Sequence, residues 1–192
     1  MAEQYTICSP AANSSGFFPI TSDSPRVLIL GSFPSIQSLR HCEYYGNPQN
    51  HFWKIMDALF AIDPLLPYRE RIEYLTRHHI ALWDVIRICK RRGSADDKIR
   101  EPVFNDISGF LTAHPTVRLI VLNGTAAGRY YHRMNMTPDI ENNILPSTSP
   151  ANTRYTLAEK VGAWKIVREN CKKGKVSGKN YRSIRNFKNM TW

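Results

Sequence analysis

The 192-residue sequence contains no apolar run long enough to span a bilayer. Its N-terminus has no basic region followed by an apolar stretch, so it predicts no secretory signal. Hydrophobic residues make up 42% of the chain and charged residues 22%, which is typical of globular proteins. Together these features predict one domain with a substantial core, located in the cytoplasm and not at a membrane.

Cysteine is scarce, and no C-x-x-C pair occurs among Cys8, Cys42, Cys89 and Cys171. The histidines also lack the spacing of paired metal ligands. A disulfide framework, a structural zinc site and an iron–sulfur cluster are therefore not expected. The simplest interpretation is four free thiols buried in the protein.

Several common catalytic motifs are also absent. The sequence has no Walker phosphate loop, no G-x-G-x-x-G fingerprint, no nucleophile elbow and no H-E-x-x-H motif. The segment "GSFPS" after the first predicted strand is too short and wrongly spaced for a phosphate loop. These absences argue against a nucleotide-hydrolysing enzyme, a dinucleotide-dependent enzyme and a zinc protease.

Positive charge is in excess, with a formal net charge of +10. Such a balance favours a polyanionic partner, and nucleic acid is the first candidate. Residues 171–192 carry seven basic residues and no acidic one, which leaves +3 on residues 1–170. This basic extension fits either an arm that contacts DNA or a solvated tail.

The apolar pattern predicts strands that alternate with helices. Residues 1–24 are rich in Ser, Pro and Asn and are expected to be irregular, residues 25–170 form the domain, and residues 171–192 form the basic extension. Buried strands are predicted at Arg26–Gly31, Ile80–Val85 and Arg118–Gly124, with a fourth, short strand in Asn142–Pro150. Helices are predicted at Pro48–Leu59, Tyr68–His78, Asp106–Ala113, Thr125–Arg133 and Leu157–Asn170. Asn47 and Pro48 fit the N-cap and the first position of the first of these helices, whose buried face carries Phe52, Ile55, Met56 and Leu59.

This alternation predicts an α/β fold with a parallel sheet covered by helices on both faces. Ligands of such sheets bind beyond the carboxyl ends of the strands. Four segments should meet there: Gly31–Ser38 with the stretch "YYGNPQNHFW", Asp84–Arg87, Asn123–Gly124 and Leu145–Asn152. They offer amides, hydroxyls, aromatic rings and one carboxylate, Asp84. This chemistry suits a flat heterocycle, and in a basic protein a nucleobase flipped out of DNA is the natural ligand.

Four motifs in the same order resemble the uracil-DNA glycosylase superfamily. They are "ILGSFPSIQSLRHCEYYGNPQNHFWKI", "LWDVI", "LNG" and "LPSTSPAN", and they are most similar to the hypoxanthine-DNA (deoxyinosine) glycosylase branch. The resemblance covers about Val27 to Val167. It implies a three-layer α/β/α sandwich with a central parallel sheet of about four strands. It also implies hydrolysis of the bond between a damaged base and deoxyribose, with no metal and no other cofactor.

One position departs from the pattern of the superfamily. A catalytic Asp or Asn usually stands two residues after the glycine of the first motif, and here that residue is Phe33. In the deoxyinosine branch the essential amide lies in the N-P-x-N-x-F-W segment, which maps to Asn50. The resemblance therefore implies that Asn50 orients the attacking water. Asn47 is better explained as a helix cap.

The resemblance also assigns the remaining site residues. Base-binding roles fall on Gly31, Ser32, Phe33, Tyr45, Asp84 and Asn123, with Tyr45 as the stacking face. Contacts to the DNA backbone fall on Pro34, Ser35, Pro146, Ser147, Thr148, Ser149 and Pro150. Simpler explanations remain open for several of them, because a tyrosine can be a packing residue and Asp84 or Asn123 can serve loop and turn geometry alone.

The predicted function is base excision from double-stranded DNA that contains deaminated bases, above all hypoxanthine, by a monomeric, monofunctional enzyme that associates with the nucleoid through DNA. One alternative is a uracil- or mismatch-directed glycosylase on the same fold, although Phe33 lacks the polar group that uracil activity usually uses. The other is a catalytically silent module that binds damaged DNA.

Overall fold

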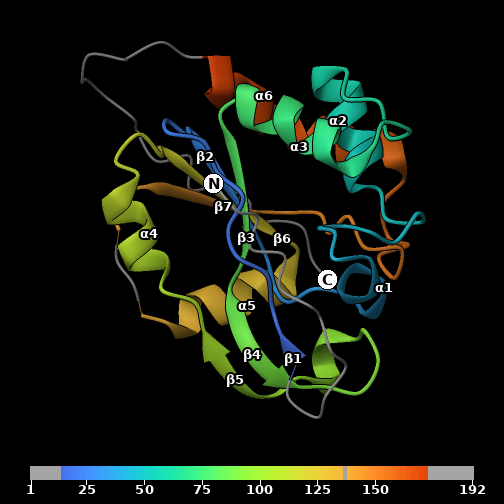
Figure 1. Cartoon of the computed structure of the whole chain (residues 1–192), viewed down its shortest axis with the longest axis vertical. Coiled ribbons are helices and arrows are strands. Elements are labelled where there is room, and N and C mark those ends of the chain that lie inside the picture. The colour runs from blue at the N-terminus through green and yellow to red at the C-terminus, as the bar shows by residue number, and fades with distance from the viewer. Residues whose placement is uncertain (1–13, 136–137, 173–192) are drawn as a thin grey trace, which may run out of the picture.

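The computed structural model describes residues 14–135 and 138–172, and its centre is a four-stranded parallel sheet (Figure 1). The strands are β2 (Val27–Gly31), β3 (Ile80–Asp84), β6 (Leu119–Asn123) and β7 (Glu141–Leu145). Their order is β3-β2-β6-β7, and every neighbouring pair is parallel. The predicted strands and their parallel arrangement are confirmed.

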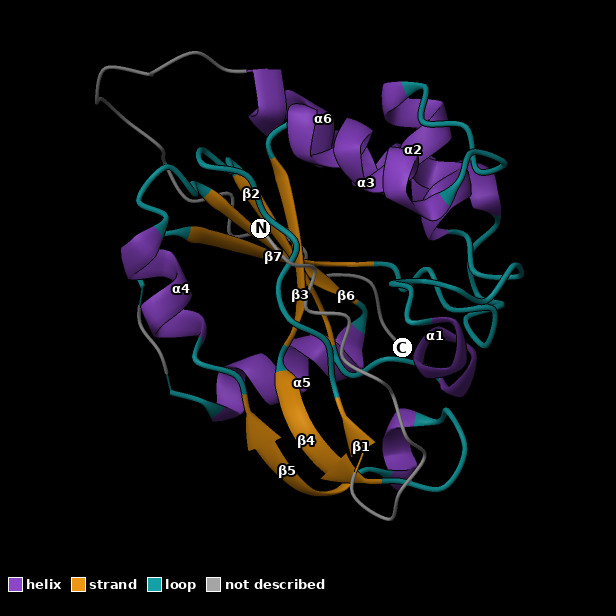
Figure 2. Ribbon diagram, in the orientation of Figure 1, coloured by secondary structure: helices purple, strands orange, loops and turns teal. Residues whose placement is uncertain are grey.

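Helices cover both faces of this sheet (Figure 2). One face carries α2 (Phe52–Phe60), α3 (Tyr68–Arg77) and α6 (Leu157–Lys172), and the other carries α4 (Ile107–Ala113) and α5 (Thr125–Arg133). The predicted three-layer α/β/α sandwich is thus confirmed.

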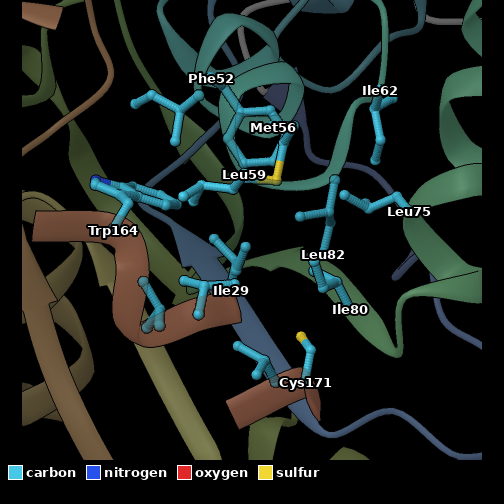
Figure 3. Packing of buried hydrophobic residues seen from close by; sticks show 14 of the residues in the cluster. Ile29, Phe52, Met56, Leu59, Ile62, Leu75, Ile80, Leu82, Trp164 and Cys171 are labelled. Atoms are coloured by element: carbon cyan, nitrogen blue, oxygen red, sulfur yellow. The ribbon is translucent and has the colours of Figure 1, made fainter. Parts of the chain in front are cut away.

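Two apolar cores lie on the two sides of the sheet because side chains alternate along each strand. Val27 and Ile29 of β2 belong to the core with α2, α3 and α6, and Leu28 and Leu30 belong to the core with α4 and α5. Figure 3 shows Ile29 in the first core together with Phe52, Met56 and Trp164. All residues of β2 are buried, which explains its continuous apolar sequence.

The start of α2 differs from the prediction. The helix begins at Phe52 with His51 at the N-cap position, not at Asn47 and Pro48. Asn47 instead closes a turn: its Oδ1 accepts from the Gln49 backbone N–H at 2.9 Å, and its carbonyl accepts from the Asn50 N–H at 2.8 Å. An Asn-Pro pair fits a turn as well as a helix start, and here the turn is formed.

A second, antiparallel sheet was not predicted. It consists of β1 (Ser14–Ser15), β4 (Ile86–Lys90) and β5 (Arg100–Phe104) in the order β1-β4-β5. Its outer strand β5 is short, largely exposed and contains a proline, so its sequence lacks the apolar alternation of a strand. A short helix, α1 (Ile36–His41), follows β2 and was also not predicted. Residue 20 pairs with β3 through an isolated bridge, so pairing extends into a stretch expected to be irregular.

Two further expectations concern thiols and membranes. Cys89 and Cys171 are free and buried, as predicted. Cys42 is free but exposed, so the prediction that it is buried was wrong. Cys8 lies outside the described residues. Within the two described ranges, the helices are too short or too polar to cross a bilayer. The basic extension beyond Lys172 also lies outside the described residues.

Candidate active site

The carboxyl ends of the four parallel strands bring the predicted segments together. Gly31 at the end of β2 is opposite Asp84 at the end of β3, and Asn123 at the end of β6 is opposite Leu145 at the end of β7. The loop after β7 lies beside the segment that precedes α2, because the His51 backbone N–H donates to the Thr148 carbonyl at 2.9 Å. The convergence expected from the strand pattern is therefore present.

Gly31 has a steric reason to be glycine. A Cβ atom at this position would lie only 2.2 Å from Asp84 Oδ1 and 3.7 Å from the Tyr45 hydroxyl. Any side chain here would displace the Asp84 carboxyl group. Gly31 therefore makes room for an acid at the floor of the site.

Asp84 is buried and only partly satisfied. Its side chain is 5% exposed, and Oδ2 has no hydrogen-bond partner in the part of the chain that the structure describes. Burial first, and the charge of Asp96 second, raise the pKa of Asp84 from 3.8 to about 7, against a smaller opposing effect of Arg91. A buried polar oxygen without a partner is costly, which makes this carboxyl group a candidate for bonding a ligand.

Asn123 joins three parts of the site through its amide. Its Nδ2 donates to the Tyr45 hydroxyl at 3.2 Å and to Thr148 Oγ1 at 2.9 Å. Its Oδ1 accepts from the Thr148 backbone N–H at 2.9 Å. Both ends of the amide are thereby fixed, and the Tyr45 oxygen, which accepts from Asn123, keeps its own proton for donation.

Tyr45 lies against Phe52 at the entrance to α2. The two rings stack with centroids 3.8 Å apart and an interplanar angle of 15°. Burial and the nearby Asp84 raise the pKa of Tyr45 far above its ordinary value, so the hydroxyl stays protonated. The backbone of Tyr45 has φ of 56°, which is uncommon for a residue other than glycine and indicates a position held by its surroundings. Tyr44 has a packing role instead, because it is buried and makes an edge contact with Phe17.

Asn50 is half-buried at the start of α2. Its Oδ1 accepts from the Phe52 backbone N–H at 3.0 Å, which fixes the direction of the side chain and satisfies a donor of the first helical turn. An amide oxygen has a second lone pair, and Nδ2 adds two donors. The side chain can therefore hold a water or a substrate atom while it remains attached to the helix.

The segment after β2 is occupied by internal contacts. Ser32 Oγ donates to Asp96 Oδ1 at 2.7 Å, the buried Phe33 ring lies under the Arg91 guanidinium at 4.9 Å, and Arg91 also donates to the Pro34 carbonyl. Ser35 caps α1 through the Ser38 N–H. These contacts hold the segment at the rim of the site and use many of its hydrogen-bonding groups. The base and DNA contacts predicted for Ser32, Phe33, Pro34 and Ser35 remain predictions.

The loop after β7 is held by a set of short-range hydrogen bonds. Trp164 Nε1 donates to the Pro146 carbonyl at 3.0 Å, and Asn152 Nδ2 donates to the Ser147 carbonyl at 3.0 Å. Ser147 Oγ accepts from the Ser149 N–H at 3.2 Å. Thr148 is fully buried, so its side chain supports Asn123 inside the protein, while Ser147, Ser149 and Pro150 are partly exposed.

Sequence reasoning missed the residues that support this site from a distance. Arg91 and Asp96 form an ion pair, with 3.8 Å between an Arg91 guanidinium nitrogen and Asp96 Oδ1, and the Arg91 side chain is only 3% exposed. Their sequence segment is charged, which is typical of a solvated surface turn. Lys160 is fully buried on α6 beside His51. No local pattern could reveal this burial, because the contacts of Arg91 with Pro34, of Asp96 with Ser32 and of Lys160 with His51 join residues remote in the sequence. No cluster of three or more metal-ligating side chains occurs in residues 14–135 and 138–172.

Amides, a tyrosine hydroxyl and a buried acid lie together at the carboxyl edge of this α/β/α sandwich. The chain belongs to the uracil DNA glycosylase superfamily, whose family profile matches residues 18–168, and it is a DNA glycosylase of that superfamily. It is 36% identical over 153 residues to the hypoxanthine DNA glycosylase of Methanosarcina acetivorans, covering 79% of this chain and 96% of that one.

Two further comparisons agree with this assignment. The hypoxanthine DNA glycosylase of Methanosarcina barkeri is 36% identical over 148 residues, covering 77% of this chain and 93% of that protein. A solution NMR structure of a candidate uracil DNA glycosylase from Methanosarcina acetivorans superposes with a TM-score of 0.68 at 34% identity, covering 81% of this chain and 98% of that one. The resemblance inferred from the four motifs is confirmed.

Proposed function

We propose that this protein removes hypoxanthine from deoxyinosine in double-stranded DNA as a monofunctional, monomeric glycosylase that leaves an abasic site. The observation that carries the proposal is the fixed group of Asn123, Tyr45 and Thr148 beside the Asp84 carboxyl, whose Oδ2 has no hydrogen-bond partner among the described residues. The two Methanosarcina relatives described as hypoxanthine DNA glycosylases support the choice of base.

The base is read by groups that the protein has already oriented. Hypoxanthine offers acceptors at O6 and N7 and a donor at N1. The Tyr45 hydroxyl, which already accepts from Asn123, supplies a donor, and Asp84 supplies an acceptor in either ionisation state and a donor when it is protonated. A site prepared in this way loses little entropy when the flipped base enters.

Asn50 is the proposed catalytic residue. In the reaction the C1′–N9 bond breaks with its electron pair going to the base, and a water oxygen bonds to C1′ while its proton leaves to the solvent or the base. Oδ1 of Asn50 keeps one lone pair for that water, and its link to the Phe52 N–H fixes the direction from which water attacks. Because an amide is a weak base, the rate depends on orientation and on a leaving group stabilised by the site.

The remaining predicted residues form the surroundings of this centre in the proposal. Gly31, Ser32 and Phe33 shape the floor beside Asp84. The loops at Pro34–Ser35 and Pro146–Pro150 would contact the phosphates on either side of the extruded nucleotide. Backbone-fixed loops of this kind hold a DNA strand without reading its sequence.

A panel of duplexes, each with one damaged base, tests the substrate assignment. The protein is mixed with each duplex, and the products are heated in alkali so that abasic sites become strand breaks. Cleavage at inosine supports the proposal. Cleavage at uracil alone would identify a uracil-directed enzyme, and binding without any cleavage would identify a silent DNA-binding module.

A further inference from the structure

His51 and Lys160 form a contact that joins α2 to α6 beside the loop after β7. Lys160 is completely buried, and its Nζ donates to the Asn152 carbonyl at 2.9 Å. The same Nζ lies 3.5 Å from His51 Nδ1. One turn further along α6, Trp164 donates to the Pro146 carbonyl, so α6 holds both ends of this loop.

This contact decides which ring nitrogen of His51 carries the proton. An ammonium group has donors and no acceptor, so the nitrogen that faces it must be the unprotonated one. Nδ1 faces Lys160, and the proton of the neutral ring therefore sits on Nε2. Burial, then Lys160 on α6 and Lys54 on α2, lower the pKa of His51 from 6.5, in agreement with a neutral ring.

His51 and Asn123 contact the loop after β7 through different atoms of Thr148. The Thr148 N–H and Oγ1 contact Asn123 at the carboxyl edge of the sheet, whereas the Thr148 carbonyl accepts from the His51 backbone N–H. The ring is half-exposed and stands next to Asn50, the proposed catalytic residue. A donor on this ring is therefore one residue away from the side chain at which the extruded nucleotide is proposed to react.

We propose that the Nε2–H of His51 donates a hydrogen bond to the DNA phosphate next to the extruded nucleotide, and that Lys160 is its positioning residue. Lys160 fixes the tautomer and the place of the ring, and its buried charge adds to the attraction for the phosphate. The inference rests on the proposed placement of DNA along Pro146–Pro150.

The test measures the dissociation constant of the full chain for a duplex that carries one tetrahydrofuran abasic-site analogue. His51→Leu removes the donor, whereas His51→Gln keeps an N–H near the position of Nε2. Because a hydrogen bond to a charged group is strong, His51→Leu should weaken binding about tenfold and His51→Gln by less than about threefold. Equal affinity of His51→Leu and the unmodified chain, or equal losses in both variants, would overturn the proposal.

Lys160→Met supplies a readout that a purely structural role would not change. Without the ammonium, His51 should titrate nearer its ordinary pKa, so binding should tighten between pH 7.5 and pH 6 more than in the unmodified chain. The same pH response in both proteins would count against a positioning role for Lys160. If Lys160→Met does not fold, the two His51 variants alone decide whether His51 donates to the phosphate. Release of hypoxanthine by the unmodified chain is measured in parallel, so failure of the proposed function is seen separately.

Discussion

The buried carboxyl of Asp84 should make the stability of the protein depend on pH. Its pKa is about 7 in the folded state, compared with an ordinary value of 3.8, so the folded protein favours the protonated acid. A raised carboxyl pKa contributes stability below pH 3.8, and this contribution is lost as the pH rises through about 7. Asp84→Asn keeps the shape of the side chain and removes the ionisation.

The size of the effect follows from these two pKa values. At 1.36 kcal/mol per pKa unit, the whole difference is worth about 4 kcal/mol, of which roughly half or more should develop between pH 5 and pH 8. Asp84→Asn should therefore gain about 2–3 kcal/mol of unfolding free energy, relative to the unmodified chain, when both are taken from pH 5 to pH 8.

Urea denaturation of both proteins at several pH values measures this difference. Asp57→Asn, at an exposed position on α2, is the matched control and should show no such trend. If the stability difference between Asp84→Asn and the unmodified chain is the same at pH 5 and pH 8, the carboxyl is not held in a desolvated site and the reasoning fails.

Three other substitutions test the geometry around Asp84 and Asn123. Gly31→Ala places a Cβ atom 2.2 Å from Asp84 Oδ1, so it should cost about 1–3 kcal/mol in urea denaturation and lower the single-turnover rate; an unchanged rate would remove the steric argument. Thr148→Val deletes one hydroxyl next to Asn123 and should cost about 1 kcal/mol of unfolding free energy with weaker excision, which the same two assays measure. Tyr45→Phe keeps the stack on Phe52 but loses the hydroxyl, so kcat/KM for an inosine duplex should fall with little change in melting temperature; an equal kcat/KM would exclude base contact by the hydroxyl.

The sheet and its helices were accessible from sequence because their signals are local. Runs such as Val27–Leu30 are buried on both faces, and α6 ends within two residues of its predicted end. The sequence also placed Gly31, Asp84 and Asn123 at one edge, since the ends of parallel strands meet there.

What the sequence did not reveal depends on contacts between distant residues. The prediction for the start of α2 was wrong because Asn47 and Pro48 serve a turn, and the helix begins after His51, whose N–H donates to the distant Thr148 carbonyl. The antiparallel sheet was missed because β5 is short, charged and exposed. The buried charge of Lys160 has no sequence signal, since its environment is made by residues of another helix and a loop.

The central claim is that Asn50 performs the chemistry at this site. Its most direct test is the single-turnover rate of hypoxanthine release from an inosine duplex, measured for the unmodified chain and for Asn50→Ala, with Asn47→Ala as the control for loss of an asparagine in the same segment. Asn50→Ala should lower the rate about 100-fold or more with affinity for the duplex largely kept, while Asn47→Ala should leave it nearly unchanged. Release of hypoxanthine by Asn50→Ala at the rate of the unmodified chain would contradict the account.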